Sequence, residues 1–178
     1  MKSFRDLVVV KQPMEIVWVC VRDRLPQLAE QLDDLERIEV LEREQLGPGQ
    51  VRLVNRWHSS QKIPRLLQQR LGAGAVSWLD RNEWDDNTRI CRWAIEPSIL
   101  AEHIRCAGTT SYQPAMGGRG TRIAFAGEFD MAPGALRDLA GPLEKPLSAF
   151  VESIVTIFIP KNLRKVMDAA GRLIAADS

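Results

Sequence analysis

The chain lacks the features that would mark a membrane, secreted or nucleic-acid-binding protein. No stretch approaches the roughly 20 apolar residues that a membrane-spanning helix needs. Charges at Lys2, Arg5 and Asp6 interrupt the region where a secretory signal would have its apolar core. The 24 basic and 23 acidic residues are spread along the chain, without a basic cluster for nucleic acid or a membrane surface. We therefore expect a cytoplasmic protein with no nucleic-acid partner and no integral membrane association.

Histidine and cysteine are scarce as well. His58 and His103 are the only histidines, and Cys20, Cys91 and Cys106 are widely spaced with no C-x-x-C pair. Metal sites in proteins usually need three or four clustered ligands, and isolated cysteines in apolar runs are typically buried and reduced. Strand alternation places both histidines on the outer side of their strands. The sequence thus predicts no metal site, no disulfide and no cofactor.

What is present is a normal globular composition, with 45% apolar and 26% charged residues in 178. We expect one domain over residues 1–178. A valine-rich strand over 3–11 comes first, and Pro13 and Pro26 then begin two short helices. Period-two alternation between 37 and 131 predicts six more strands. Their ranges are 37–44, 51–57, 76–85, 88–96, 103–113 and 121–131. Short turns between most of them indicate an antiparallel sheet.

Two helical segments complete the pattern. Residues 63–71 have leucines on one helical face and are followed in the sequence by glycines. This pattern fits either a lid over a pocket or a helix covering a sheet edge. From Pro142 onward the period is helical, and Phe150, Ile154 and Phe158 form one stripe. Pro160 lacks an N–H and clashes with the preceding turn, so we expect it to kink or break this last helix.

Three short motifs add a family resemblance. Residues 13–18 read Pro-Met-Glu-Ile-Val-Trp, residues 117–122 read Gly-Gly-Arg-Gly-Thr-Arg, and residues 162–165 read Asn-Leu-Arg-Lys. Together with the element order, they resemble the SRPBCC superfamily, which includes START lipid-transfer domains, birch pollen allergen relatives and polyketide cyclases. The resemblance implies an α+β helix-grip fold: a seven-stranded curved antiparallel sheet around a long C-terminal helix, with two short helices after the first strand. The 63–71 helix and Pro160 depart from the family pattern.

Tryptophan is the most informative residue type. Four of the five tryptophans lie between positions 57 and 93. Alternation places Trp57 on the inner sheet face with Leu53 and Asn55, and Trp93 forms a similar row with Ile95. In a helix-grip fold this face lines the pocket. The rings either fill the core or line a ligand space, and these two interpretations are evenly balanced.

Two polar residues share the inner face. Asn55 either binds a ligand's polar end or bonds to a neighbouring strand or a water, and the second interpretation is favoured because buried amides usually find such partners. Asp80 lies on the same face as Trp78. It is the one carboxylate that could act as a general acid or base, although no partner residue stands at a suitable spacing.

The predicted ligand-binding residues come from the inner sheet face and the helical stripe. They are Leu53, Asn55, Trp57, Trp78, Asp80, Trp93, Ile95, Phe125, Phe150, Ile154 and Phe158. We expect them to bind a small hydrophobic or amphipathic molecule such as a lipid, polyketide, isoprenoid or pigment. The alternatives are a polyketide cyclase or dehydratase-like enzyme on the same fold, and a co-chaperone-like interaction module with a closed pocket. The sequence identifies no catalytic residue, favours a binder over an enzyme, and leaves a homodimer open.

Overall fold

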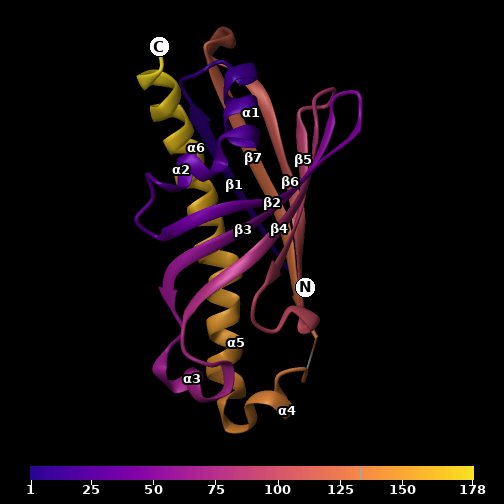
Figure 1. The fold of residues 1–178 in the computed structure, drawn as a ribbon. Helices are drawn as coiled ribbons and strands as arrows, with labels where there is room; N and C mark the ends of the chain where they lie inside the picture. Colours follow the sequence, from indigo (N-terminus) through magenta and orange to yellow (C-terminus); the bar gives the residue numbers. More distant parts are fainter. Residues whose placement is uncertain (133) are drawn as a thin grey trace.

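A computed structural model describes residues 1–132 and 134–178 of the chain (Figure 1). Seven strands form one antiparallel sheet in the spatial order β1-β7-β6-β5-β4-β3-β2. The strands are β1 (Lys2–Val10), β2 (Leu35–Gly47), β3 (Gln50–Lys62), β4 (Ala75–Asp85), β5 (Ile90–Pro97), β6 (Ile104–Ala115) and β7 (Gly120–Met131). The predicted seven-stranded antiparallel sheet is therefore confirmed.

β2 and β3 are longer than alternation predicted. β2 has register irregularities near Leu35, Val40 and Gln45, and such bulges disturb the regular inner-outer alternation. β3 continues for five residues beyond Trp57 in polar sequence. The tight turn between them uses Gly49, whose positive φ of 70° is easily adopted by glycine.

The helices lie mainly on one side of the sheet. They are α1 (Met14–Asp23), α2 (Leu25–Ala29), α3 (Arg65–Leu71), α4 (Arg137–Ala140), α5 (Glu144–Ser153) and α6 (Ile159–Ala176). Figure 1 shows α5 and α6 as one long rod across the sheet, with α1 and α2 beside the C-terminal half of α6. None of the described helices is long and apolar enough to cross a membrane.

Pro160 neither breaks the last helix nor divides it into two separate helices. Residues Ile154–Phe158 form a π-helical turn between α5 and α6, in which the Ile159 N–H donates to the Ile154 carbonyl five residues back. The wider turn accommodates the proline ring and its missing N–H, a recognised cause of helix distortion. The Asn162 side chain donates a hydrogen bond of 2.9 Å to the Phe158 carbonyl. The helix therefore continues through Pro160.

Ion pairs hold α6 against the rest of the molecule. Arg164 donates to Asp6 at 2.5 Å and to the Leu7 carbonyl of β1 at 2.9 Å. Lys165 pairs with Asp34 in the segment before β2. These contacts join α6 to β1 and to the segment before β2, and so hold it over the inner sheet face.

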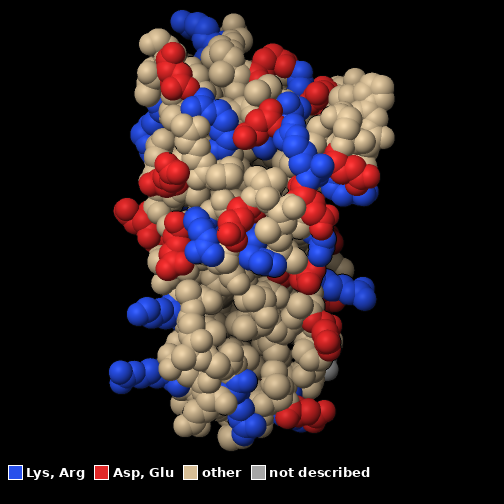
Figure 2. Space-filling view, viewed as in Figure 1, with Lys and Arg blue, Asp and Glu red and all other residues tan. Residues whose placement is uncertain are grey.

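The surface is unevenly charged. In Figure 2, charged side chains of both signs crowd the upper half of this face, whereas the lower half, over α3 and α5, is mostly uncharged. Leu66 of α3 and Ile157 of the π-helical turn are each more than half exposed. The hydrophobic core nevertheless lies between the sheet and the helices, where most of the apolar side chains are buried.

Candidate functional site

A cavity of about 50 Å³ lies between the inner sheet face and the helices α1, α2 and α6. The sheet contributes Trp57, Trp78, Asp80, Asn82, Trp84, Cys91, Trp93, Ile95, Thr110 and Tyr112. The helices contribute Val21, Leu25, Ile159, Leu163, Val166 and Met167. Aromatic rings dominate the sheet side and aliphatic chains the helix side. Asp80 is the lining carboxylate, and it has no basic side chain among the lining residues.

Five of the predicted ligand-binding residues line this cavity: Trp57, Trp78, Asp80, Trp93 and Ile95. They come from β3, β4 and β5, which are neighbours in the sheet. Because every second residue of a strand faces the same side, alternation was enough to bring these side chains together.

Leu53, Asn55 and Phe125 are buried on the same sheet, but they do not line the cavity. Asn55 lies directly opposite Asp80 in the pairing of β3 with β4. These three side chains therefore belong to the core outside the cavity wall.

The helical stripe lies away from the cavity. Phe150 and Ile154 are buried, and Ile154 faces Val76 and Ile104 at the other end of the sheet. Phe158 meets Trp78 edge-on, with ring centroids 6.1 Å apart. The helix side of the cavity is formed one to two turns later, from Ile159 to Met167. This cavity therefore meets the last helix beyond the π-helical turn, C-terminal to the predicted stripe.

Asp80 is the chemically distinctive group in the cavity. Burial raises the pKa of its carboxyl to about 6, against the lowering effects of Asn82, Asn55 and Trp57. The side chain is partly buried and lines the cavity. The carboxyl can therefore change protonation near neutral pH.

A short hydrogen-bonded chain extends from Asp80 along β4. The Asn82 amide donates to Asp80 at 2.8 Å, and the Trp84 indole N–H donates to the Asn82 oxygen at 2.6 Å. On the neighbouring strands, Trp93 donates to Thr110 at 3.1 Å. These bonds fix the Asn82 amide orientation and the two indole rings.

Two further donors lie beside Asp80 without a partner. Within the described chain, neither atom of the Asn55 amide makes a hydrogen bond, and neither does the Trp57 indole N–H. Both side chains lower the pKa of Asp80 although they fall outside hydrogen-bonding geometry. Buried polar groups without partners are uncommon in native proteins. Of the two partners expected for Asn55, a neighbouring strand does not supply a hydrogen bond within the described chain.

Solved structures of other proteins share this arrangement of sheet and helices. The aromatase/cyclase ZhuI from Streptomyces sp. R1128 superposes with a TM-score of 0.63 at 20% identity, over 97% of this chain and 95% of that one. TTHA0849 from Thermus thermophilus superposes with a TM-score of 0.62 at 23% identity, over 99% of this chain and 100% of that one. Ara h 8.0201 superposes with a TM-score of 0.60 at 15% identity, over 98% of each chain. The chain has the helix-grip fold.

The helix-grip fold was the expectation from the sequence motifs, and its neighbours include the classes of protein that the SRPBCC resemblance implied. No family model and no curated protein matches the sequence. At these identities the likeness concerns the fold, so the function has to be argued from the cavity itself.

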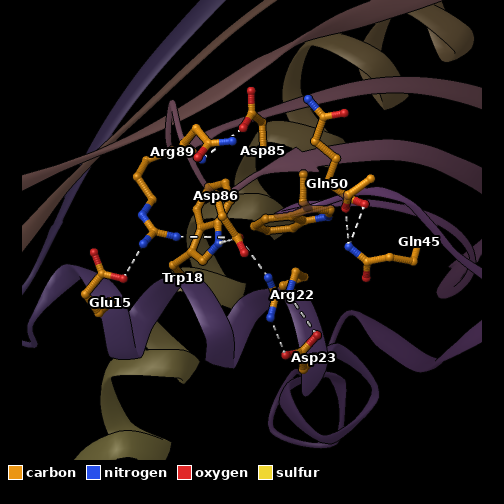
Figure 3. A network of polar contacts seen from close by, with 12 residues as sticks. Glu15, Trp18, Arg22, Asp23, Gln45, Gln50, Asp85, Asp86 and Arg89 are labelled. Carbon is orange, nitrogen blue, oxygen red and sulfur yellow. Dashed lines mark hydrogen bonds and ion pairs between the residues drawn. The ribbon is translucent and has the colours of Figure 1, made fainter.

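In this helix-grip chain, α1 closes one side of the cavity and is held by a polar cluster (Figure 3). Asp86, in the turn between β4 and β5, accepts hydrogen bonds from the Trp18 indole at 2.7 Å and from Arg22 at 2.9 Å. Arg89 lies over the Trp18 ring, 5.4 Å from its centroid, and pairs with Glu15. Trp18 is completely buried and contacts the edges of cavity residues Trp84 and Tyr112. The cluster therefore fixes the α1 wall of the cavity.

The remaining sequence candidates lie elsewhere. His58 contacts Glu39 at 2.7 Å on the outer sheet face, as alternation predicted. His103 lies in a short 3-10 turn before β6 rather than within the strand, because the strand begins one residue later. The α3 segment contributes no lining residue to the cavity. Its Leu67 is buried, and Leu66 points to solvent.

On the sheet side, the predicted binding residues did not include Asn82, Trp84, Cys91, Thr110 and Tyr112. Asn82 could have been found, because it lies two residues after Asp80 and must share its face. Thr110 and Tyr112 continue the inward row of Ile104 and Cys106 on β6 and could have been found in the same way. The lining residues of α6 carried no such signal, because their orientation depends on the π-helical turn.

Proposed function

We propose that the chain binds a small apolar or amphipathic molecule in the cavity between the sheet and α6. The supporting observation is the composition of the wall: four indole rings and several aliphatic side chains surround one polar corner at Asp80. Binding sites for small molecules typically combine apolar walls with a few convergent polar groups that orient the ligand. The indole N–H of Trp57, a lining residue, has no partner within the described chain and adds to that polar corner.

The cavity size restricts what can be buried. At about 50 Å³ it is smaller than the roughly 300–1,000 Å³ of typical ligand pockets. We infer that a single small ring or head group enters the cavity. The rest of a larger ligand would extend out of it beside Leu163, the half-buried lining residue of α6. Burial of apolar area, worth about 25 cal/mol per Å², would supply most of the affinity.

The direct test fills the cavity and measures binding of a neutral probe. Indole should raise the melting temperature of the wild-type protein, because a ligand that binds only the folded state stabilises it. Leu163→Trp should abolish the shift by occupying the space. Leu66→Trp places the same ring on α3, outside the cavity, and should keep the shift in melting temperature. Equal shifts in all three proteins, or none in any, would contradict the proposal, and the latter result would favour a closed interaction module.

Native mass spectrometry of freshly purified protein, compared with the denatured mass, identifies the natural ligand. A discrete extra mass that leaves on denaturation and is missing from Leu163→Trp would give the chemical class of that ligand.

A second candidate function is a cyclase or dehydratase, and the observation that favours it is the pKa of Asp80, raised to about 6. A carboxyl group poised near neutral pH can act as general acid or base, typically contributing about 10²–10⁴-fold in rate. If the chain is such an enzyme, Asp80→Asn should still bind a reactive poly-β-ketone but lose at least about 100-fold in the rate of water loss. Unchanged turnover in that variant, or no water loss with the wild type, would contradict this second candidate.

A further inference from the structure

Resting on the proposed binding function, we propose that the cavity selects organic cations, with a protonated amine or quaternary ammonium group bound beside Asp80 among the indole rings. The inference concerns the charge of the ligand, which neither the fold nor the general apolar character of the cavity determines.

The first argument is the charge of the cavity. Asp80 is the lining carboxylate, and no lysine, arginine or histidine of the described chain lines the cavity with it. Its hydrogen-bond partner is the neutral Asn82 amide. An ionised carboxylate without a counter-ion is costly in an apolar site. A cationic ligand would supply that counter-ion, whereas an anionic ligand would place two like charges together.

The second argument is the aromatic wall. Trp57, Trp78, Trp84 and Trp93 surround the same space, and Tyr112 adds a fifth ring. Indole is the aromatic side chain with the strongest attraction for cations, and aromatic cages are a common means of binding ammonium groups. The chain already uses this interaction nearby, where the Arg89 guanidinium lies 5.4 Å from the centroid of the Trp18 ring.

The third argument is the fit of size and polarity. A cavity of about 50 Å³ suits a compact head group better than a multi-ring skeleton. The unpartnered donors of Asn55 and Trp57 lie beside Asp80 and favour its ionised form. With a pKa of about 6, Asp80 is mainly an anion at pH 7 and above, and it lines the same cavity as the tryptophans.

The test uses two probes of nearly identical shape, tert-butylammonium and tert-butanol, at about pH 8, two units above the Asp80 pKa of about 6. Binding is followed by the indole N–H resonances of the tryptophans in two-dimensional NMR spectra. We expect the cation to bind at least about tenfold more tightly than the alcohol. Tetramethylammonium, which has no N–H donor, should also bind if the rings contribute.

Asp80→Asn should remove the preference for the cation while leaving the weaker binding of tert-butanol. The matched control is Glu83→Gln on the same strand, whose side chain pairs with Arg52 on the outer face. This control should keep the preference. A cation preference that survives in Asp80→Asn would overturn the assignment to Asp80.

The wild-type protein provides a second measurement that does not depend on any variant. Affinity for tert-butylammonium should fall as the pH drops below about 6, because Asp80 becomes protonated while the probe stays charged. The other titratable groups facing Asp80 are Cys91 on β5 and Tyr112 on β6, and burial raises the pKa of both well above their ordinary values. The lining residues of α1, α2 and α6 are uncharged. These groups therefore stay neutral in the tested range.

The outcomes separate the two proposals. If tert-butanol binds as tightly as the cation, the charge selectivity is wrong and the binding function stands. If indole shifts the melting temperature but neither tert-butyl probe perturbs the tryptophan resonances, the cation inference again fails alone. If no probe of any kind binds, both proposals fail.

Discussion

Asp80 shows how a single side chain can link stability to the chemistry of a site. Its pKa is raised from 3.8 to about 6 because the folded chain surrounds it with apolar groups. The folded protein therefore binds a proton more tightly than the unfolded chain does. It follows that ionising Asp80 weakens the fold, so this group costs stability when it is charged.

The residue-scale prediction concerns Asp80→Asn. Between about pH 4 and pH 6 the folded wild type holds more protons than the unfolded chain, so this group makes stability decrease as the pH rises through that window and stay constant above it. Asparagine does not ionise. At about pH 4.5 the variant should have nearly the same free energy of unfolding as wild type. At about pH 8 it should be more stable by about 1–3 kcal/mol. Urea denaturation at the two pH values measures the difference.

Glu83→Gln is the matched control for this measurement, since it removes a carboxylate from the outer face of the same strand. It should show no comparable difference between the two pH values. A constant difference between Asp80→Asn and wild type across the range would mean that the pKa of Asp80 is ordinary.

At the scale of elements, two glycines allow rings to cross the inner face of the sheet. Gly108 of β6 and Gly127 of β7 are paired opposite each other. The Trp93 ring of β5 extends over them and stacks with Phe4 of β1, with centroids 6.0 Å apart. A Cβ on Gly127 would lie 2.5 Å from the Phe4 ring and 2.6 Å from the Trp93 ring. One wall of the cavity thus depends on glycine in a strand interior, where it often marks a close approach.

Gly127→Ala should therefore destabilise the protein by about 1–3 kcal/mol, the usual cost of overpacking, and shift the emission of Trp93. Urea denaturation followed by tryptophan fluorescence measures both effects. Gly47→Ala is the control, because its Cβ would meet only the Gln50 side chain at an ordinary 3.8 Å. Equal stabilities for the two variants would show that the rings have room to move.

Strand alternation explains which parts of the fold and the site could be predicted. A period of two fixes the side that each residue faces, so Trp57, Trp78, Asp80 and Trp93 were placed together from sequence alone. In a helix, the face on which a residue lies depends on the geometry of every turn before it, so spacing in the sequence alone does not fix that face. The helix residues that line the cavity therefore lie beyond the regular stripe through Phe158, on the other side of a π-helical turn. The unpaired state of Asn55 depends on distances across strands, which a sequence does not contain.

At the scale of the whole molecule, the first strand completes the sheet. β1 pairs with β7 along its full length, from Lys2 opposite Phe129 to Val10 opposite Thr121. Helix α6 also rests on β1: Gly171 comes so close that a Cβ there would lie 2.7 Å from the Val10 side chain. The two ends of the chain therefore stabilise each other through contacts that are distant in sequence.

Removal of residues 1–11 should abolish cooperative unfolding. The deletion exposes the edge of β7 and uncovers the face of α6 that rests on Val8 and Val10, both buried in the intact protein. We expect near-UV circular dichroism to lose its aromatic signal while helical far-UV signal remains. A synthetic peptide of residues 1–11 added in trans should restore part of the near-UV signal. A truncated chain that still melts in one sharp transition would contradict this prediction.

The π-helical turn over Ile154–Phe158 has a consequence for how this chain is aligned with others. A π-helical turn contains one residue more than the α-helical turn it replaces, so it is equivalent to a single-residue insertion that the helix has absorbed. An alignment drawn without a gap would match the residues on one side of the turn correctly and shift those on the other side by one position. Cavity residues such as Leu163 and Val166 should therefore be matched to other helix-grip chains by superposition rather than by counting along the helix.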